Sequence, residues 1–364
     1  MCDRPITSEK FSLTDCLSCA GCVSITEDTE DYKDTIELIK KGGVNIIITP
    51  QAKMSLYTVY NKTNRRTFRE FEYSLIKVLS NNNNKVIDSS IGTKLLLNQE
   101  IDLLKSKNTV ISTICPGTVL YVYNTLDGID VNLSNNLSPV ELSAKYINTY
   151  NNNVNISIVM CKDKRVEAKN NSCIKYCITA KEIYSYFLNT TELFQQNTPL
   201  DSNPNENPEN FKYSEFEYKY SISRILNGST SGGIFEGVTE YLSSQSGHTT
   251  QIIKKNPKHI ELLPGEKKTL QLFGSSRIIS FITKIKKERA LLSEYAYIEM
   301  NMCLGGCLFG PSQSAIPDSQ LYTELIQDKF SQESIEINPL ETKSIRRFFK
   351  YKKPKDKKNY LVEW

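Results

Sequence analysis

Short apolar runs alternate with longer amphipathic stretches through the middle of the chain. The apolar runs predict strands at 45–49, 86–87, 109–114 and 154–160, and the residues after the first run predict a helix around 52–60. Strands that alternate with helices are typical of an α/β protein with a largely parallel sheet. The pattern therefore predicts this fold class for the central part of the chain.

Two cysteines stand directly after predicted strands. Cys115 follows the run 109–114, and Cys161 follows the run 154–160. In open α/β sheets, ligands collect at the carboxyl ends of the strands, so we expect both thiols to face the same crevice. Cys177 lies in a predicted strand-to-helix step, and we expect Cys177 and Cys173 to be core or surface thiols rather than ligands.

A third group of cysteines lies near the N-terminus. Cys16, Cys19 and Cys22 have the spacing C-x2-C-x2-C. Three thiolates this close cannot spread around one tetrahedral ion without strain, whereas they can take three corners of an iron–sulfur cube. A zinc site more often pairs two neighbouring ligands with two distant ones. The spacing favours an iron–sulfur cluster; zinc and three unliganded buried cysteines are the alternatives.

Length and composition narrow the class of protein. A chain of 364 residues can form two domains or one large two-lobed domain. A net charge of +4, from 45 basic and 41 acidic residues, is too balanced to indicate nucleic acid binding by itself. We see neither an apolar leader nor a run near the about 20 residues that span a bilayer. We expect a soluble, intracellular protein in which most of the ten cysteines have a role other than forming disulfides.

Two further cysteines lie close together in the C-terminal half. Cys303 and Cys307 are separated by Leu304, Gly305 and Gly306, and the glycines would let the backbone approach a bulky inorganic ligand. Each strand-end cysteine alone is more often a small buried hydrophobe than a ligand. Four thiols from three separated loops, in a chain that also carries the N-terminal run, favour a cluster held between two lobes.

These three settings resemble the signature loops of iron-only ([FeFe]) hydrogenases. They resemble still more closely the cytosolic hydrogenase-like proteins of iron–sulfur assembly, the Nar or nuclear prelamin A recognition factor-like family. The matching segments are Ser12–Cys22, Thr49–Gln51, Ser112–Gly117, Leu137–Pro139, Val159–Glu167, Gly228–Glu236, Glu299–Gly310 and the chain-terminal Trp364. The resemblance covers roughly residues 10–312.

The resemblance implies a domain organisation and two [4Fe-4S] clusters. It implies a ferredoxin-like cluster-binding segment at 1–42, a two-lobed hydrogenase-like body at 43–312, and a C-terminal extension with a basic tail at 313–364. The implied ligands of the first cluster are Cys16, Cys19, Cys22 and, as the available fourth ligand, Cys2. A free N-terminal thiol is the alternative interpretation of Cys2.

The implied ligands of the second cluster are the four cysteines of the signature loops. They are Cys115, Cys161, Cys303 and Cys307. Lys164 and Glu167 match the lysine and glutamate that follow the cysteine of the second loop in the family. A buried Lys–Glu pair near a net-negative cluster could equally be plain structural charge compensation.

One departure from the hydrogenases bears on catalysis. Hydrogenases carry a second cysteine directly before the first-loop ligand, and it moves protons at the di-iron site; this chain has Ile114 there. An isoleucine can neither donate nor accept a proton. His248 and His259, the two histidines, lie in polar stretches and are expected at the surface. We therefore expect a non-catalytic homologue; an iron-only hydrogenase, or an iron–sulfur oxidoreductase or electron-transfer protein, is the alternative.

The resemblance also implies a cellular role. It implies a component of cytosolic iron–sulfur protein assembly, an adaptor or carrier that helps deliver clusters to cytosolic and nuclear apoproteins. The expected location is the cytoplasm, with the nucleus as a second location. The implied partner is a targeting complex that includes a WD-repeat propeller, with Trp364 as anchor and the basic run 343–358 as electrostatic guide. No membrane partner is expected, and nucleic acid is the weaker option for the tail.

Overall fold

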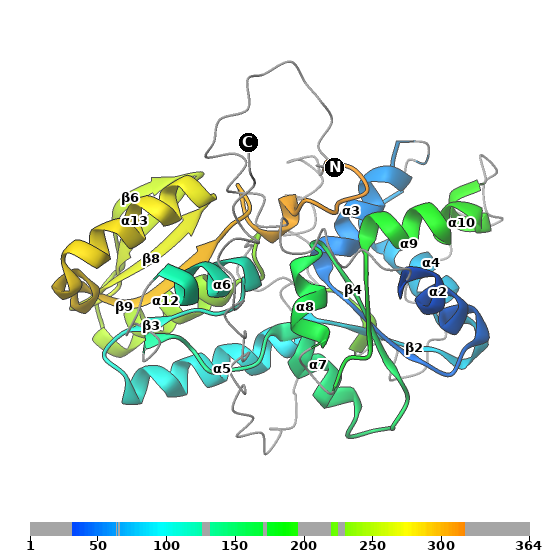
Figure 1. Cartoon of the computed structure of the whole chain (residues 1–364), viewed down its shortest axis with the longest axis horizontal. Coiled ribbons are helices and arrows are strands. Elements are labelled where there is room, and N and C mark those ends of the chain that lie inside the picture. The colour runs from blue at the N-terminus through cyan, green and yellow to red at the C-terminus, as the bar shows by residue number, and fades with distance from the viewer. Residues whose placement is uncertain are drawn as a thin grey trace.

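Two β-sheets, one in each of two lobes, organise the chain (Figure 1). The computed structural model describes residues 31–62, 64, 66–125, 132–169, 173–195, 220–224 and 230–316. The α/β class and the two lobes agree with the sequence-based expectation. The expectation that one largely parallel sheet would hold the strands before both Cys115 and Cys161 is wrong, because these strands belong to different sheets.

The first sheet is parallel throughout. Its order is β2-β1-β4-β5, with β1 at Asn45–Ile48, β2 at Lys85–Asp88, β4 at Asn155–Val159 and β5 at Tyr176–Thr179. All four positions of β1 are buried, as expected of a parallel strand covered on both faces. The predicted strand-to-helix step at Cys177 is present as β5 followed by α9.

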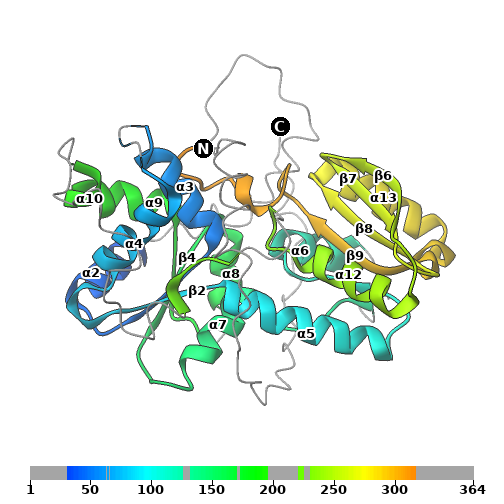
Figure 2. The same cartoon turned by 180° about the vertical axis from the view of Figure 1, so that it is seen from behind.

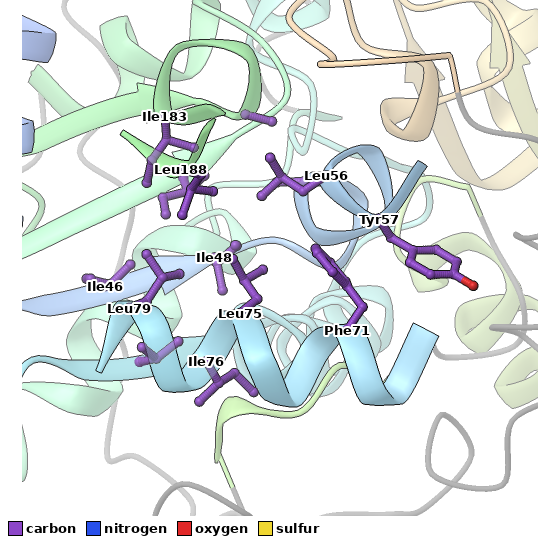
Figure 3. Packing of buried hydrophobic residues seen from close by; sticks show 14 of the residues in the cluster. Ile46, Ile48, Leu56, Tyr57, Phe71, Leu75, Ile76, Leu79, Ile183 and Leu188 are labelled. Carbon is purple, nitrogen blue, oxygen red and sulfur yellow. The ribbon is translucent and has the colours of Figure 1, made fainter. Parts of the chain in front are cut away.

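Helices cover both faces of this sheet. The helices of the lobe are α2 (Asp31–Lys41), α3 (Pro50–Tyr60), α4 (Phe68–Leu79), α7 (Pro139–Ile147), α8 (Asp163–Lys169), α9 (Ala180–Tyr186) and α10 (Glu192–Gln195), with short 3-10 turns η3 (Asn81–Asn83) and η5 (Leu188–Thr190). Ile46 and Ile48 pack with Phe71 of α4 (Figure 3), whereas Ile47 between them packs on the opposite face with Leu142 of α7. The alternation of one strand thus divides the core into two layers.

The second sheet is mixed. Its order is β3-β9-β8-β7-β6, with β3 at Val110–Ile111, β6 at Gln251–Asn256, β7 at His259–Leu263, β8 at Lys268–Phe273 and β9 at Tyr295–Asn301. β9 pairs in parallel with β3 and β8, and β6, β7 and β8 form antiparallel pairs. The strand predicted at 109–114 is present but shorter, because the chain leaves the sheet after Ile111 on its way to Cys115.

The helices of the second lobe lie on both sides of this sheet. They are α6 (Pro116–Thr125), α12 (Ile234–Ser246) and α13 (Ser275–Lys287), with 3-10 turns η8 (Arg289–Glu294) and η9 (Cys307–Phe309). Ile278 and Ile282 of α13 pack with Leu270 and Ile298 on one face. Phe235 of α12 packs with Tyr297 on the other face. The described part of the chain contains no helix that is both long and apolar enough to cross a membrane.

The long helix α5 (Ser90–Ser106) joins the two lobes. It follows β2 of the first sheet, precedes β3 of the second, and runs from the middle of the molecule along the base of the second lobe (Figure 2). Gly92 permits close packing on α7, since a Cβ there would lie 1.8 Å from the Pro139 carbonyl oxygen. One apolar cluster includes Ile87 of the first sheet and Tyr297 of the second, so the lobes share part of their core.

A buried charge network holds the segment 220–224 against the first lobe. The Lys53 ammonium group is fully buried and lies 2.8 Å from Glu72 and 2.7 Å from Asp88. Ser223 donates its hydroxyl to Asp88 (2.7 Å) and its backbone N–H to Glu72 (2.8 Å). Each buried charge therefore has an opposite charge and a hydrogen bond, which is the condition for burying it at an acceptable cost.

The last described segment returns from the second lobe to the first. It is drawn in orange in Figure 1, where it leaves β9 and crosses between the lobes. Ser312 donates its N–H to the Met160 carbonyl oxygen (3.0 Å), and its own carbonyl oxygen accepts from the N–H of Lys181 (3.1 Å). Ser314 donates its hydroxyl to the Ala180 carbonyl oxygen (2.9 Å). The segment after β9 therefore contacts the end of β4 and the start of α9 in the first lobe.

Candidate metal centre

Three loops at the carboxyl ends of strands carry the four signature cysteines. Cys115 lies between β3 and α6, and its carbonyl oxygen accepts the N–H of Val119 (3.1 Å) in the first turn of that helix. Thr118 donates its hydroxyl to the Met300 carbonyl oxygen (2.7 Å), which fastens α6 to β9. Cys161 follows β4 two residues before α8 begins. The first two loops are thus anchored at both ends by regular structure.

The third loop, which holds Cys303 and Cys307, follows β9 through tight turns. Gly305 and Gly306 have φ angles of +82° and +91°, a conformation that favours glycine. A Cβ on Gly306 would lie 2.4 Å from the Thr230 hydroxyl and 2.6 Å from the Ser231 hydroxyl. The two glycines therefore let the loop turn sharply and press against the residues that precede α12.

The four cysteine thiols form one connected group. The Cys161 thiol interacts electrostatically with Cys303 and Cys115, and the Cys307 thiol interacts with Cys115. All four residues are half-buried and free of disulfides. Among the described residues, no three His, Cys, Asp or Glu side chains gather tightly enough to hold a single metal ion. A cube of iron and sulfide binds one thiolate at each of its four corners, and the group supplies four thiols from three loops.

Burial disfavours the charged form of these thiols. It raises the pKa of Cys161 well above its ordinary value, and the Asp163 carboxylate and the neighbouring thiols add to the rise. Burial likewise raises the pKa of Cys307 to about 12, and Lys164 opposes the rise at both cysteines. Thiolates at this place need additional positive charge, which iron ions would supply. The donor set therefore fits an iron–sulfur cluster.

Lys164 links the second cysteine loop to the first. Its ammonium group donates to the Ile114 carbonyl oxygen (3.0 Å) and to a carboxylate oxygen of Glu167 (2.5 Å). Glu167 is buried, whereas Lys164 retains a little exposure. The pair is thus a structural tie, and Lys164 also places a positive charge near Cys161 and Cys307.

Ile114 stands directly before Cys115, and Asn301 stands two residues before Cys303. The Ile114 side chain is buried in the shared apolar core, and its carbonyl oxygen is the Lys164 acceptor. Asn301 donates its side-chain amide to the buried carboxylate of Glu299 (2.8 Å). Neither of these side chains is an acid or a base that could pass a proton to the cysteine group.

The other residues singled out in the sequence are either outside the described residues or at other places in the fold. Cys2, Cys16, Cys19, Cys22 and Trp364 lie outside the described residues. Cys177 is buried in the core on β5, where burial raises its pKa to about 11, and Cys173 is half-buried. His248 is exposed, as expected, whereas His259 is half-buried on β7 with its Nε2 3.4 Å from Glu261.

Sequence reasoning missed two residues beside the cysteine group. The buried Ser231 hydroxyl lies against Gly306 of the third loop, where a Cβ on that glycine would be 2.6 Å from it, and the buried Glu299 carboxylate opposes ionisation of the Cys307 thiol. The segment Gly228–Glu236 matches the family pattern, but the pattern does not indicate a role for Ser231. The signal that could have pointed to it is the Gly232-Gly233 pair, which turns the chain at positive φ directly after the serine.

The chain belongs to the family described as "Iron only hydrogenase large subunit, C-terminal domain". The model of this family matches residues 43–311, which include all four cysteines of the group. This match confirms the resemblance to hydrogenase-like proteins that the signature loops indicated.

Curated relatives of the chain carry the names of assembly factors. The chain is 24% identical over 315 residues to "Cytosolic Fe-S cluster assembly factor NAR1" of Encephalitozoon cuniculi. The matched region covers 85% of this chain and 82% of that protein. It is 29% identical over 191 residues to the protein of the same name from Debaryomyces hansenii, covering 45% of this chain and 34% of that one. A relative from Dictyostelium discoideum, 25% identical over 219 residues, is named "Probable cytosolic Fe-S cluster assembly factor narfl" and covers 53% of this chain and 41% of that one.

Solved structures of [FeFe]-hydrogenases share the fold. One such structure has a TM-score of 0.56 at 14% sequence identity, over 86% of this chain and 87% of that chain. An [FeFe]-hydrogenase from Chlamydomonas reinhardtii has a TM-score of 0.55 at 13% identity over the same shares. The two-lobed hydrogenase-like fold expected from the sequence is therefore confirmed.

Proposed function

We propose that this protein is a component of cytosolic iron–sulfur protein assembly. In this role it acts as an adaptor or carrier that helps deliver clusters to cytosolic and nuclear apoproteins. The observation that carries the proposal is the meeting of Cys115, Cys161 and the Cys303–Cys307 loop between two lobes. The names of the curated relatives support it, since each names a cytosolic Fe-S cluster assembly factor.

Two [4Fe-4S] clusters belong to the proposal. Cys115, Cys161, Cys303 and Cys307 would hold the second cluster, supported by their electrostatic contacts and by a backbone that glycine brings close. Cys16, Cys19, Cys22 and Cys2 would hold the first, supported by the C-x2-C-x2-C spacing.

The first loop supports a non-catalytic role as part of the proposal. The residue before Cys115 is aliphatic and buried, and its carbonyl oxygen is already engaged by Lys164. A general acid or base must stand within hydrogen-bond reach of the proton it moves, and Ile114 offers none. The alternative, a hydrogenase that retains a di-iron subsite, draws support from the shared fold and from the family match. Infrared spectroscopy separates the two, since cyanide and carbonyl stretches belong to a di-iron subsite and not to a cube.

A partner and a cellular location belong to the same proposal. The proposed partner is an assembly targeting complex with a WD-repeat propeller, bound through Trp364, the one tryptophan of the sequence. The basic residues of 343–358 would guide this encounter in a salt-dependent way. The proposed location is the cytoplasm and, for nuclear clients, the nucleus.

The test measures cluster delivery in cells depleted of this protein. Radioactive iron incorporation into cytosolic and nuclear iron–sulfur proteins is followed after re-expression of the wild-type chain, of Cys303→Ala, or of Cys173→Ala. Cys173 is the matched control because it is a half-buried thiol outside the four-cysteine group. The proposal expects incorporation to recover with the wild type and Cys173→Ala, and to stay low with Cys303→Ala. Normal incorporation in the depleted cells would refute it.

A further inference from the structure

The strand β6 forms one edge of the second sheet. In the order β3-β9-β8-β7-β6 it pairs with β7, and among the described residues no strand lies along its other side. Its first five residues, from Gln251 to Lys255, are all exposed. The backbone N–H and C=O groups along the outer side of β6 are therefore open to pairing with a further strand.

Two large apolar side chains are exposed on this edge strand. Ile252 is 64% exposed and Ile253 is 47% exposed. Ile253 has no partner on β7, because Ile252 pairs with Leu262 and Lys254 pairs with Glu261. The extra residue makes a β-bulge, a feature that is frequent at sheet edges. An exposed edge that carries apolar side chains is a template for pairing with another chain.

The same edge is positively charged. It carries three exposed lysines, Lys254, Lys255 and Lys258. Residues 251–258 include no acidic side chain, and within the described part of the chain none of these lysines forms an ion pair. Glu261, which lies opposite Lys254 on β7, contacts Lys268 (3.4 Å) and the Tyr295 hydroxyl (3.1 Å) instead. The positive charge of this edge is therefore available to a partner.

The charge decides which kind of strand can pair with β6. Two copies of β6 paired with each other would bring four lysines, Lys254 and Lys255 of each copy, into an interface only six residues long. Like charges on neighbouring strands destabilise the pairing, and lysines are a common means of keeping edge strands apart. Acidic side chains opposite the same lysines stabilise it. The edge thus disfavours a second copy and favours an acidic strand.

We propose that β6 is a docking site for an acidic, extended segment of a partner protein, which adds a strand to the second sheet. In this mode of recognition the main-chain hydrogen bonds supply affinity and the side chains supply specificity. Acidic residues of the partner would face Lys254 and Lys255, and its apolar residues would cover Ile252 and Ile253. The inference goes beyond the proposed function, because none of the cysteines takes part in this site.

The test measures binding of a fluorescent peptide that alternates glutamate and valine to the full-length protein, by fluorescence anisotropy. Lys254→Glu/Lys255→Glu should weaken binding about tenfold, because two favourable cross-strand charge pairs become repulsive. Lys286→Glu/Lys287→Glu is the matched control, since it makes the same change of charge at exposed positions of α13, and it should bind as the wild type does. Equal binding by the wild type and by Lys254→Glu/Lys255→Glu would overturn the inference.

Hydrogen exchange shows whether the bound peptide adds a strand. The peptide should slow the exchange of the amides of β6. A peptide of the same sequence with methylated backbone nitrogens keeps its charge but cannot donate hydrogen bonds, so it should bind more weakly and leave the exchange unchanged. Equally tight binding of the methylated peptide would overturn the inference, because charge alone would then account for binding.

Two other occupants of the edge give distinct results. If a second copy is the occupant, the free protein forms a dimer in sedimentation experiments, and the glutamate–valine peptide does not dissociate it. If nucleic acid is the occupant, a single-stranded oligouridine binds more tightly than the peptide and loses affinity in Lys254→Glu/Lys255→Glu. Either result would overturn the inference and leave the proposed clusters untouched.

Discussion

The ammonium group of Lys164 lies 3.0 Å from the carbonyl oxygen of Ile114 and donates a hydrogen bond to it. This contact joins two loops that belong to different sheets, since one follows β4 and the other follows β3. It also uses the backbone of Ile114, whose own side chain is buried in the apolar core. The lysine thus ties the two lobes at the candidate metal centre.

Removing this tie should loosen the centre. Lys164→Met deletes the link to Ile114 and leaves Glu167, whose side chain is only 2% exposed, without its lysine partner. Breaking one member of a buried ion pair costs about 3–5 kcal/mol. We expect a lower melting temperature and faster loss of iron to a chelator. The double variant Lys164→Met/Glu167→Gln should recover part of the stability, and a double variant as unstable as the single one would contradict this account.

The close approach at Gly306 should not tolerate a methyl group. In Gly306→Ala the new Cβ would overlap the hydroxyls of Thr230 and Ser231, at 2.4 and 2.6 Å, and the residue would keep an unfavourable positive φ. We expect this variant to lose the iron of the second cluster, measured by iron analysis. Gly247→Ala is the matched control, because Gly247 also has a positive φ (+67°) but nothing within 4 Å. It should lose about 1 kcal/mol of stability and no iron.

The strands and their terminal cysteines could be predicted because each apolar run is short and stops at a thiol. The division into two sheets could not, since β3 is only two residues long and its partner β9 comes more than 180 residues later, at Tyr295–Asn301. The close approach of Ser231 to Gly306 was equally hidden. It depends on positive φ angles at Gly232 and Gly306, and a sequence shows the glycines but not the turns they make.

The buried carboxyl group of Glu100 predicts a pH dependence of stability. Burial raises the pKa of Glu100 from 4.5 to about 7, although Ser134 and Asn136 donate hydrogen bonds to it. The unfolded chain would release this proton near pH 4.5, whereas the folded chain keeps it until about pH 7. Stability from this group is therefore complete below pH 4.5 and falls by about 3 kcal/mol as the pH rises to 7.

Glu100→Gln tests this dependence. The variant should flatten the decrease of the melting temperature between pH 4.5 and 7, because the amide does not ionise. Glu240→Gln, an exposed change on α12, serves as the control and should leave the decrease as in the wild type. The prediction fails if wild type and Glu100→Gln show the same pH profile.

The most direct measurement is an iron and acid-labile sulfide count on the anaerobically purified protein. Two [4Fe-4S] clusters predict about eight iron and eight sulfide per wild-type chain, and about four of each in Cys19→Ala. Cys303→Ala should be insoluble or unstable, since ligand loss at a buried centre also removes folding free energy. A well-folded Cys303→Ala protein with the iron of the wild type, or a wild-type chain that holds zinc in place of iron and sulfide, would contradict the account.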